Sequence, residues 1–162
     1  MLPATATAVY DVIDNGPLPA GILVDSIAVH KAAHEMLVFN NQHLLKKYKI
    51  QLGLCSVGCK LYYGDHKTPE GLYHITVKNP NSQFHKSLEI SYPNATDIER
   101  ARKAGKPPGG DIMIHGLPNG EENVGPERYQ NDWTWGCISV RNADIDELFM
   151  HVNINTSILI TR

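Results

Sequence analysis

The sequence has 162 residues, of which 42% are hydrophobic and 20% are charged, a composition typical of one folded domain and not of a disordered chain. Fifteen basic residues against seventeen acidic ones give a formal net charge of −2 with no basic block, which excludes the electrostatic pattern of a nucleic-acid binder. No apolar run approaches the ~20 residues of a membrane-spanning helix, so the sequence predicts a protein that does not cross a bilayer.

The first 21 residues predict an irregular arm, because they contain Pro3, Gly16, Pro17 and Pro19. The residues that follow, 22–162, are predicted to form a single domain. The beginning of the chain lacks the basic start and the long apolar core of a secretory signal, which fits either a cytosolic protein or a trimmed form.

Short segments with alternating or brief continuous apolar residues predict β-strands from Ile22 onward. Turn signals separate these segments, such as Asn40-Asn41 after the second and Pro93 after the fifth. Residues 43–47 also fit a helical turn. The predicted strands are 27–29, 36–39, 48–52, 72–77, 88–92, 112–114 and 158–160.

Two helices have clear boundaries in the sequence. Asn94 is predicted to cap a helix over residues 95–104, which ends at Gly105 because glycine readily adopts the left-handed conformation that closes a helix. Asn142 is predicted to cap a second helix, with acidic residues near its positive end and apolar residues along one side.

The strands outnumber the helices and do not alternate with them, which predicts a β-rich mixed α+β fold and excludes a doubly wound one. A polar loop over residues 117–132 precedes the second helix. A loop of this length inside a compact domain is often functional.

A histidine and a cysteine stand out as a candidate catalytic pair. His115 follows the apolar strand 112–114, and Cys137 lies 22 positions further along the chain. A cysteine attacks as the thiolate, so a nearby histidine can accept its proton. Gly136 permits a sharp turn that exposes the sulfur, and Gly116 lets its carbonyl approach the imidazole. On spacing alone, an accidental pair remains open, because the chain has eight histidines.

The sequence around this pair resembles the L,D-transpeptidase catalytic domain family of the YkuD type. That family carries a His-Gly pair, a variable loop, a Gly-Cys element and a following asparagine, which here is Asn142. A Thr-Pro-x-Gly turn is a second hallmark. The resemblance covers residues 26–160, and two further segments resemble the YafK-like branch of the family. The matching segments are 64–71, 111–116 and 132–138 for the family, and 79–85 and 87–94 for the branch.

The resemblance implies a β-sandwich or barrel with two or three short helices that acts on peptidoglycan stem peptides without a cofactor or a metal. Cys137 would attack the carbonyl on the L-side of a diamino acid and expel a terminal D-amino acid. His115 would be the base and acid, oriented by the Gly116 carbonyl, and the main-chain N–H groups at Gly136 and Cys137 would stabilise the oxyanion. The family resemblance also implies a periplasmic or otherwise extracytoplasmic location.

Two positions depart from the pattern of many family members. Trp135 replaces a histidine two residues before the cysteine, and Ser139 replaces an arginine, with Arg141 nearby but out of register. The YafK-like branch accepts both changes and includes enzymes that cut diaminopimelate-linked bonds. The expected activity is therefore a cell-wall L,D-transpeptidase, with a peptidoglycan hydrolase that trims stems or releases tethered proteins as the alternative. A wall-binding module without catalysis is the alternative from another class.

Several further residues are predicted to contact the substrate. Trp133 and Trp135 flank the cysteine and can bind sugar or peptide faces. Thr134, His85 and Arg141 are also expected near the substrate. The loop over residues 117–132 is predicted to act as a lid over the cysteine that keeps water from the acyl-enzyme, which favours transfer over hydrolysis.

The three cysteines permit more than one interpretation. Cys137 is predicted to be the most reactive thiol, with its pKa lowered by His115 and by main-chain dipoles. Cys55 and Cys59 could form a local disulfide, could remain free thiols, or could provide half of a zinc site completed by His66 or His115.

Overall fold

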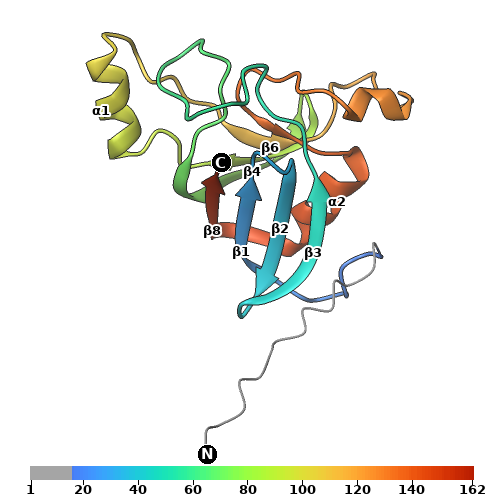
Figure 1. Cartoon of the computed structure of the whole chain (residues 1–162). Coiled ribbons are helices and arrows are strands. Elements are labelled where there is room, and N and C mark those ends of the chain that lie inside the picture. The colour runs from blue at the N-terminus through green and yellow to red at the C-terminus, as the bar shows by residue number, and fades with distance from the viewer. Residues whose placement is uncertain (1–15) are drawn as a thin grey trace, which may run out of the picture.

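The computed structural model describes residues 16–162 and contains eight strands and two α-helices (Figure 1). The helices are α1 (Ala95–Lys103) and α2 (Asn142–His151), and a short 3-10 helix, η1, covers Pro126–Tyr129. The strands are β1 (Val24–His30), β2 (Glu35–Asn40), β3 (His43–Lys49), β4 (Gly71–Ser82), β5 (His85–Ile90), β6 (Met113–His115), β7 (Ile138–Ser139) and β8 (Val152–Thr161).

The strands form one strongly curled sheet in the order β3-β2-β1-β8-β4-β5-β6-β7. The long strand β4 belongs to both halves of it, since residues 71–74 pair with β8 and the rest pairs with β5. Just beyond β3, Gln51 pairs with Ser139 of β7 through two backbone hydrogen bonds of 2.9 and 2.8 Å. This contact joins the two ends of the strand order. It confirms the predicted β-rich fold with a barrel-like sheet.

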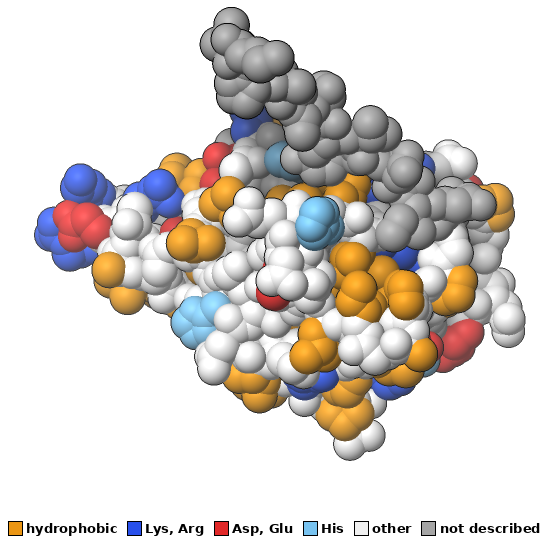
Figure 2. Space-filling model, turned by 90° about the horizontal axis from the view of Figure 1, so that it is seen from below, with side chains coloured by type: hydrophobic (Ala, Val, Ile, Leu, Met, Phe, Trp, Pro, Cys, Tyr) orange, Lys and Arg blue, Asp and Glu red, His pale blue; other side chains and the backbone are white. Residues whose placement is uncertain are grey.

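The core lies inside the curl, where alternate residues of the strands point inward. Helix α2 contacts β5, β6 and β8 and contributes Ile145 and Leu148 to this core. Hydrophobic side chains also reach the surface among polar atoms on the lower face (Figure 2). The largest fully buried side chains are Met36, Ile50, Leu52, Ile75, Leu88, Ile90, Ile114, Leu117, Ile138, Ile145, Leu148 and Ile158.

The first predicted helix is confirmed and the cap of the second is wrong. Asn94 and Asp97 form a reciprocal capping box at the start of α1, whose C-cap Ala104 is followed by Gly105 at a φ of 67°. The N-cap of α2 is Arg141, without a side-chain cap, and Asn142 is the first helical residue. The Asn142 side chain instead accepts a hydrogen bond from the Leu117 N–H. Residues 43–47, which also fitted a helical turn, belong to β3.

The part of the predicted arm that the structure describes, residues 16–21, has no helix or strand, and residues 1–15 lie outside the described part. Leu18 is buried, and its N–H donates to Glu147. The same carboxylate accepts from Lys46 Nζ at 2.6 Å and from the Tyr48 hydroxyl at 2.8 Å. Glu147 therefore ties the arm to α2 and β3. The domain boundary at residue 22 stays a prediction. Within residues 16–162, no helix is both long and apolar enough to span a membrane.

The Glu147 cluster allows a test of the fold. Glu147→Gln should lower the free energy of unfolding by about 3 kcal/mol, because it leaves the buried Lys46 ammonium without its counter-charge. The double variant Lys46→Met/Glu147→Met should lose less, since it removes both charges. Urea unfolding followed by circular dichroism measures both. A cost of the single variant below about 1 kcal/mol would contradict the role given to this ion pair.

Candidate active site

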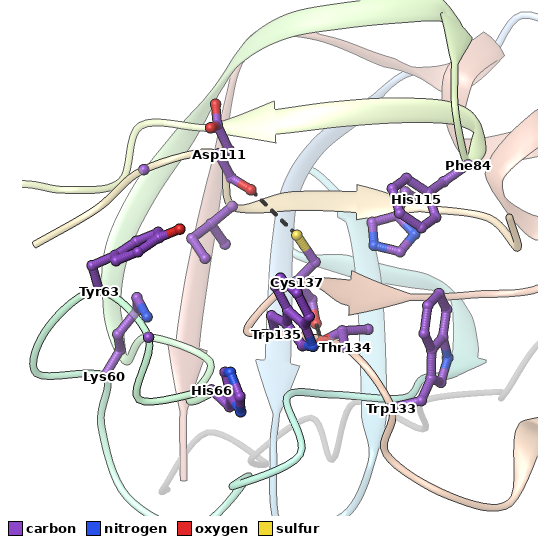
Figure 3. A pocket seen from close by; sticks show the side chains of 13 residues that line it. Lys60, Tyr63, His66, Phe84, Asp111, His115, Trp133, Thr134, Trp135 and Cys137 are labelled. Carbon is purple, nitrogen blue, oxygen red and sulfur yellow. Dashed lines mark hydrogen bonds between the residues drawn. The ribbon is translucent and has the colours of Figure 1, made fainter.

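His115 and Cys137 are brought together by the parallel pairing of β6 with β7. Ile114 pairs with Ile138 in the core, and His115 pairs with Ser139. Cys137 directly precedes β7, two residues before Ser139, so the alternation of side chains across a strand places it on the same face of the sheet as His115. Both side chains line one cavity (Figure 3). The structure thus gathers the two residues that the sequence singled out.

The His115 imidazole is buried against two aromatic rings. Its ring centroid lies 4.4 Å from that of Phe84 and 5.7 Å from that of Trp133. Burial lowers the pKa of His115 to about 4, although its hydrogen bond to the Gly116 carbonyl acts in the opposite direction. A carbonyl only accepts, so Nδ1 carries the proton in this 2.7 Å bond. The imidazole is therefore neutral at neutral pH, with the lone pair on Nε2.

Asn142 holds the backbone that orients this imidazole. Its Oδ1 accepts the Leu117 N–H at 2.8 Å, directly after Gly116. A Cβ on Gly116 would lie 2.5 Å from the same oxygen, so no larger residue fits there without displacement. The predicted approach of the Gly116 carbonyl to the imidazole is present, and Asn142 provides the contact that keeps it in place.

The Cys137 thiol is half-buried and donates to the Asp111 carbonyl at 3.3 Å, rather than to the His115 imidazole (Figure 3). Burial raises the pKa of this thiol, and the nearby Asp111 charge adds to the effect. The prediction that His115 lowers the pKa of Cys137 is therefore wrong for this structure. The physical reason is that a neutral imidazole brings no positive charge to the sulfur.

A tight turn presents the cysteine. Gly136 has a φ of 132°, and a Cβ there would lie 2.7 Å from the Lys67 carbonyl oxygen. The Thr134 hydroxyl donates to the Cys137 carbonyl at 2.7 Å and accepts from the Gly136 N–H at 3.1 Å. Thr134 therefore clamps the turn with its hydroxyl. The Gly136 N–H, which was expected to face an oxyanion, is taken by this clamp in the structure.

The cavity that contains the pair has a volume of about 670 Å³. Two of the residues predicted to contact the substrate do not line it. The His85 ring instead bonds Asp146 of α2 at 2.9 Å, and Arg141 bonds Asp144 through two contacts of 2.7 Å. These carboxylates of α2 direct both side chains away from the cavity, so their expected placement is wrong. The lining residues are Lys60, Tyr63, Gly64, His66, Phe84, Gly110, Asp111, Ile112, His115, Trp133, Thr134, Trp135 and Cys137.

The sequence model of the YkuD family, described as the L,D-transpeptidase catalytic domain, matches residues 24–160. The chain belongs to this family. It is 32% identical over 111 residues to "Putative L,D-transpeptidase YafK" of Escherichia coli K12, and the match covers 67% of this chain and 37% of YafK.

Two solved structures share the fold. The helical cell shape determining protein Pgp2 of Campylobacter jejuni superimposes with a TM-score of 0.64 at 25% identity, over 93% of this chain and 52% of Pgp2. An L,D-transpeptidase from Mycobacterium smegmatis gives a TM-score of 0.54 at 13% identity, over 84% of this chain and 58% of that protein. The chain thus spans about half the length, or less, of YafK and Pgp2.

Six side chains that line the cavity of this L,D-transpeptidase domain were not among the predicted site residues. Lys60, Tyr63 and His66 come from the segment between β3 and β4. Phe84 comes from the connection between β4 and β5, and Asp111 and Ile112 directly precede β6. His66 and Asp111 have positive φ angles of 55° and 56°. No sequence pattern predicts this backbone conformation at either residue. A signal was available for four of the six, because His66, Phe84, Asp111 and Ile112 lie in the family-like segments 64–71, 79–85 and 111–116.

The loop over residues 117–132 lies beside the cavity and contributes none of its lining. The Arg128 guanidinium lies 4.2 Å from the ring of Trp133 and pairs with Glu121 at 3.0 Å. The predicted lid over Cys137 is therefore wrong for this structure, because the loop packs on the outer side of Trp133.

The remaining cysteines are free thiols in the structure. Cys55 is exposed, whereas Cys59 is half-buried and accepts from Arg100 at 3.2 Å and from the Glu70 N–H at 3.4 Å. Among residues 16–162, no group of three or more His, Cys, Asp or Glu side chains is placed to hold a metal ion.

The burial of His115 predicts a pH-dependent stability. The unfolded histidine takes a proton near pH 6.5 and the folded one only near 4, so acid between these values favours unfolding. The free energy of unfolding should fall by about 3 kcal/mol from this group between pH 7 and 4. Urea unfolding at several pH values measures the effect. The His115→Gln variant should not show this part of the decrease in the free energy of unfolding. An equal decrease in the parent and in the variant would contradict a neutral, buried imidazole.

Asn142 provides a second test of the site. Asn142→Ala should lower the free energy of unfolding by about 1–3 kcal/mol, because it leaves the Leu117 N–H without its acceptor. Asn153→Ala is the matched control, since this exposed asparagine on β8 should cost less than about 0.5 kcal/mol. Chemical unfolding of both variants gives the difference, and equal costs would remove the positioning role of Asn142.

Proposed function

We propose that this chain is a cysteine-dependent L,D-transpeptidase that acts on peptidoglycan stem peptides. The observation that carries the proposal is a neutral imidazole whose Nε2 has no hydrogen-bond partner among residues 16–162, placed on the same sheet face and in the same cavity as a thiol. A base that is neutral at neutral pH and a nucleophile that keeps its proton at rest suit general-base catalysis. Membership of the L,D-transpeptidase family supports this choice of substrate.

The first half-reaction forms an acyl-enzyme. The Cys137 thiol rotates from the Asp111 carbonyl towards His115, and its proton moves to Nε2 as the sulfur attacks the carbonyl carbon on the L-side of the diamino acid. The C–N bond of the tetrahedral intermediate then breaks, and His115 returns the proton to the leaving amine of the terminal D-amino acid. A thioester remains on Cys137. The Gly116 carbonyl stabilises the imidazolium while it carries the second proton.

The second half-reaction transfers the acyl group. The amine of a neighbouring stem attacks the thioester and gives a proton to His115, and the C–S bond breaks to restore the thiol. The product is an L,D cross-link. The main-chain N–H groups of the Gly136–Cys137 turn are the proposed oxyanion donors, which requires the Gly136 N–H to exchange the Thr134 hydroxyl for the developing charge.

Hydrolysis is the second candidate activity. The position of the loop over residues 117–132 favours it, because a loop beside the cavity leaves the thioester open to water. The chain would then trim stem peptides or release proteins linked to them. In either case the substrate is cell-wall peptide, so we place the action outside the cytoplasm. The similarity to the cell shape determining protein Pgp2 supports a part in wall remodelling.

Defined stem tetrapeptides, followed by product mass, test the proposal. The parent should produce cross-linked dimers, whereas single loss of the terminal residue would indicate hydrolysis. Cys137→Ala should abolish turnover, and His115→Ala should lower kcat by a factor of about 10² to 10⁴, the usual effect of a positioned base. Cys55→Ala is the control and should retain full activity, because this exposed thiol lies outside the cavity lining.

Two results would contradict the proposal. Turnover that survives in Cys137→Ala excludes the thioester. No turnover on any stem, together with an unreactive Cys137 towards iodoacetamide, would favour a wall-binding module without catalysis.

A further inference from the structure

Lys60 is a charged residue of the cavity that has no part in the chemistry described above. It lies between β3 and β4 and is only 3% exposed, yet it lines the cavity together with Cys137. Its ammonium donates to the Tyr62 carbonyl at 3.0 Å and to Asp65 at 2.8 Å. An ammonium has three N–H groups, so one N–H has no partner among residues 16–162.

The ammonium is held rigidly. The Asp65 carboxylate that binds it also accepts three backbone N–H groups, from Leu61 at 2.7 Å, Tyr62 at 3.2 Å and Lys67 at 3.1 Å. Both carboxylate oxygens are thus engaged within the turn. A cation fixed by such a turn is already in place for an anion and needs little reorganisation to bind it.

The cavity has two chemically different ends. Figure 3 shows Lys60 and Tyr63 on one side of Cys137, with His115 and Phe84 on the other. In the proposed reaction the leaving nitrogen must lie near His115, which protonates it. The rest of the acylated residue, with its side chain, therefore extends towards the Lys60 end.

The charges around Cys137 leave the Lys60 end attractive to an anion. Burial raises the pKa of the thiol, the Asp111 charge raises it further and the Lys60 charge lowers it, so both charges reach the sulfur. The Asp111 side chain is exposed, and its carboxylate points away from the sulfur in Figure 3. Asp65, the partner of Lys60, does not line the cavity.

We propose that Lys60 forms a carboxylate-binding subsite in the cavity, through which the enzyme selects stem peptides with a free carboxylate close to the scissile bond. The inference rests on the proposed function for the identity of the substrate. Two carboxylates of a stem can supply the anion: the one at the end of the diamino-acid side chain and the one on the terminal residue. The placement of His115 favours the former.

Alkylation of Cys137 tests the subsite without any stem peptide. Iodoacetate carries a carboxylate and iodoacetamide does not, so the ratio of their rates reports the cation. The ratio of the iodoacetate rate to the iodoacetamide rate should be about tenfold higher at Cys137 than for N-acetylcysteine, a free thiol. A charge-assisted hydrogen bond would produce an effect of this size. Lys60→Met should bring the ratio down to that of the free thiol.

The matched control is Lys31→Met. Lys31 is equally buried and binds Gly58, Thr68 and Glu70 in the same region, but it does not line the cavity. Its replacement should leave the rate ratio unchanged. If Lys60→Met does not fold, the unmodified protein still tests the proposal. A ratio of alkylation rates at Cys137 equal to that of N-acetylcysteine overturns the proposal.

Three tetrapeptide stems identify the source of the carboxylate in the unmodified protein. One has both carboxylates free, the second has the diamino-acid side chain amidated, and the third has the terminal residue amidated. A loss of about tenfold or more in kcat/KM with one amide supports the subsite and names its ligand, whereas equal values for all three overturn it. No turnover on any stem, with the alkylation ratio intact, would reject the proposed function and keep the subsite.

Discussion

The two-residue parallel pairing of β6 with β7 is the contact on which the site depends. Strand β7 pairs with β6 on one side and with Gln51, just beyond β3, on the other. The same short strand therefore joins the ends of the curled sheet and carries the turn that presents Cys137. The contact that closes the sheet therefore also assembles the candidate catalytic pair, whose members lie 22 residues apart in the chain.

Burial of the imidazole determines how the pair works. The rings of Phe84 and Trp133 exclude water from His115 and lower its pKa, while the Gly116 carbonyl keeps the proton on Nδ1. The resting site contains a neutral base and a protonated thiol, not a thiolate–imidazolium pair. The sequence suggested the opposite, because a histidine near a cysteine usually lowers the pKa of the thiol when the histidine is charged. The depth of burial, which decides the charge, comes from residues far apart in the chain.

Local signals in the sequence predicted an element where no distant residue competes for the same side chain. The ends of α1 follow from Asn94 and Gly105, whose effects act within one helical turn, and the structure confirms them. Asn142 has the same capping propensity, but its side chain bonds the Leu117 N–H, a contact between residues 25 positions apart that no local rule contains. His85 was misplaced for a similar reason, since Asp146, 61 positions away, holds it, whereas Arg141 is held by Asp144, three positions along the chain.

The proposed chemistry and the proposed selectivity of the domain rest on different parts of the fold. His115 and Cys137 belong to the paired strands, where the sheet fixes their positions, whereas Lys60 belongs to a connection. That connection is itself anchored, since the Tyr63 N–H donates to the Pro107 carbonyl at 2.8 Å and the ring of Tyr63 packs over Gly109. Such anchored loops on a rigid sheet can change their side chains without moving the reacting atoms.

The aromatic end of the cavity couples the long loop to the base. Arg128 of the 117–132 loop lies over Trp133, and Trp133 contacts the edge of the His115 ring. A displacement of the loop would therefore shift the Trp133 indole and, through it, the His115 imidazole. No loop residue would need to enter the cavity. In the proposed reaction the loop would then act on the water exclusion and the orientation of His115, in place of a lid over Cys137. The partition of the acyl-enzyme between an amine and water would depend on how firmly Trp133 is held, because its ring keeps water from the base.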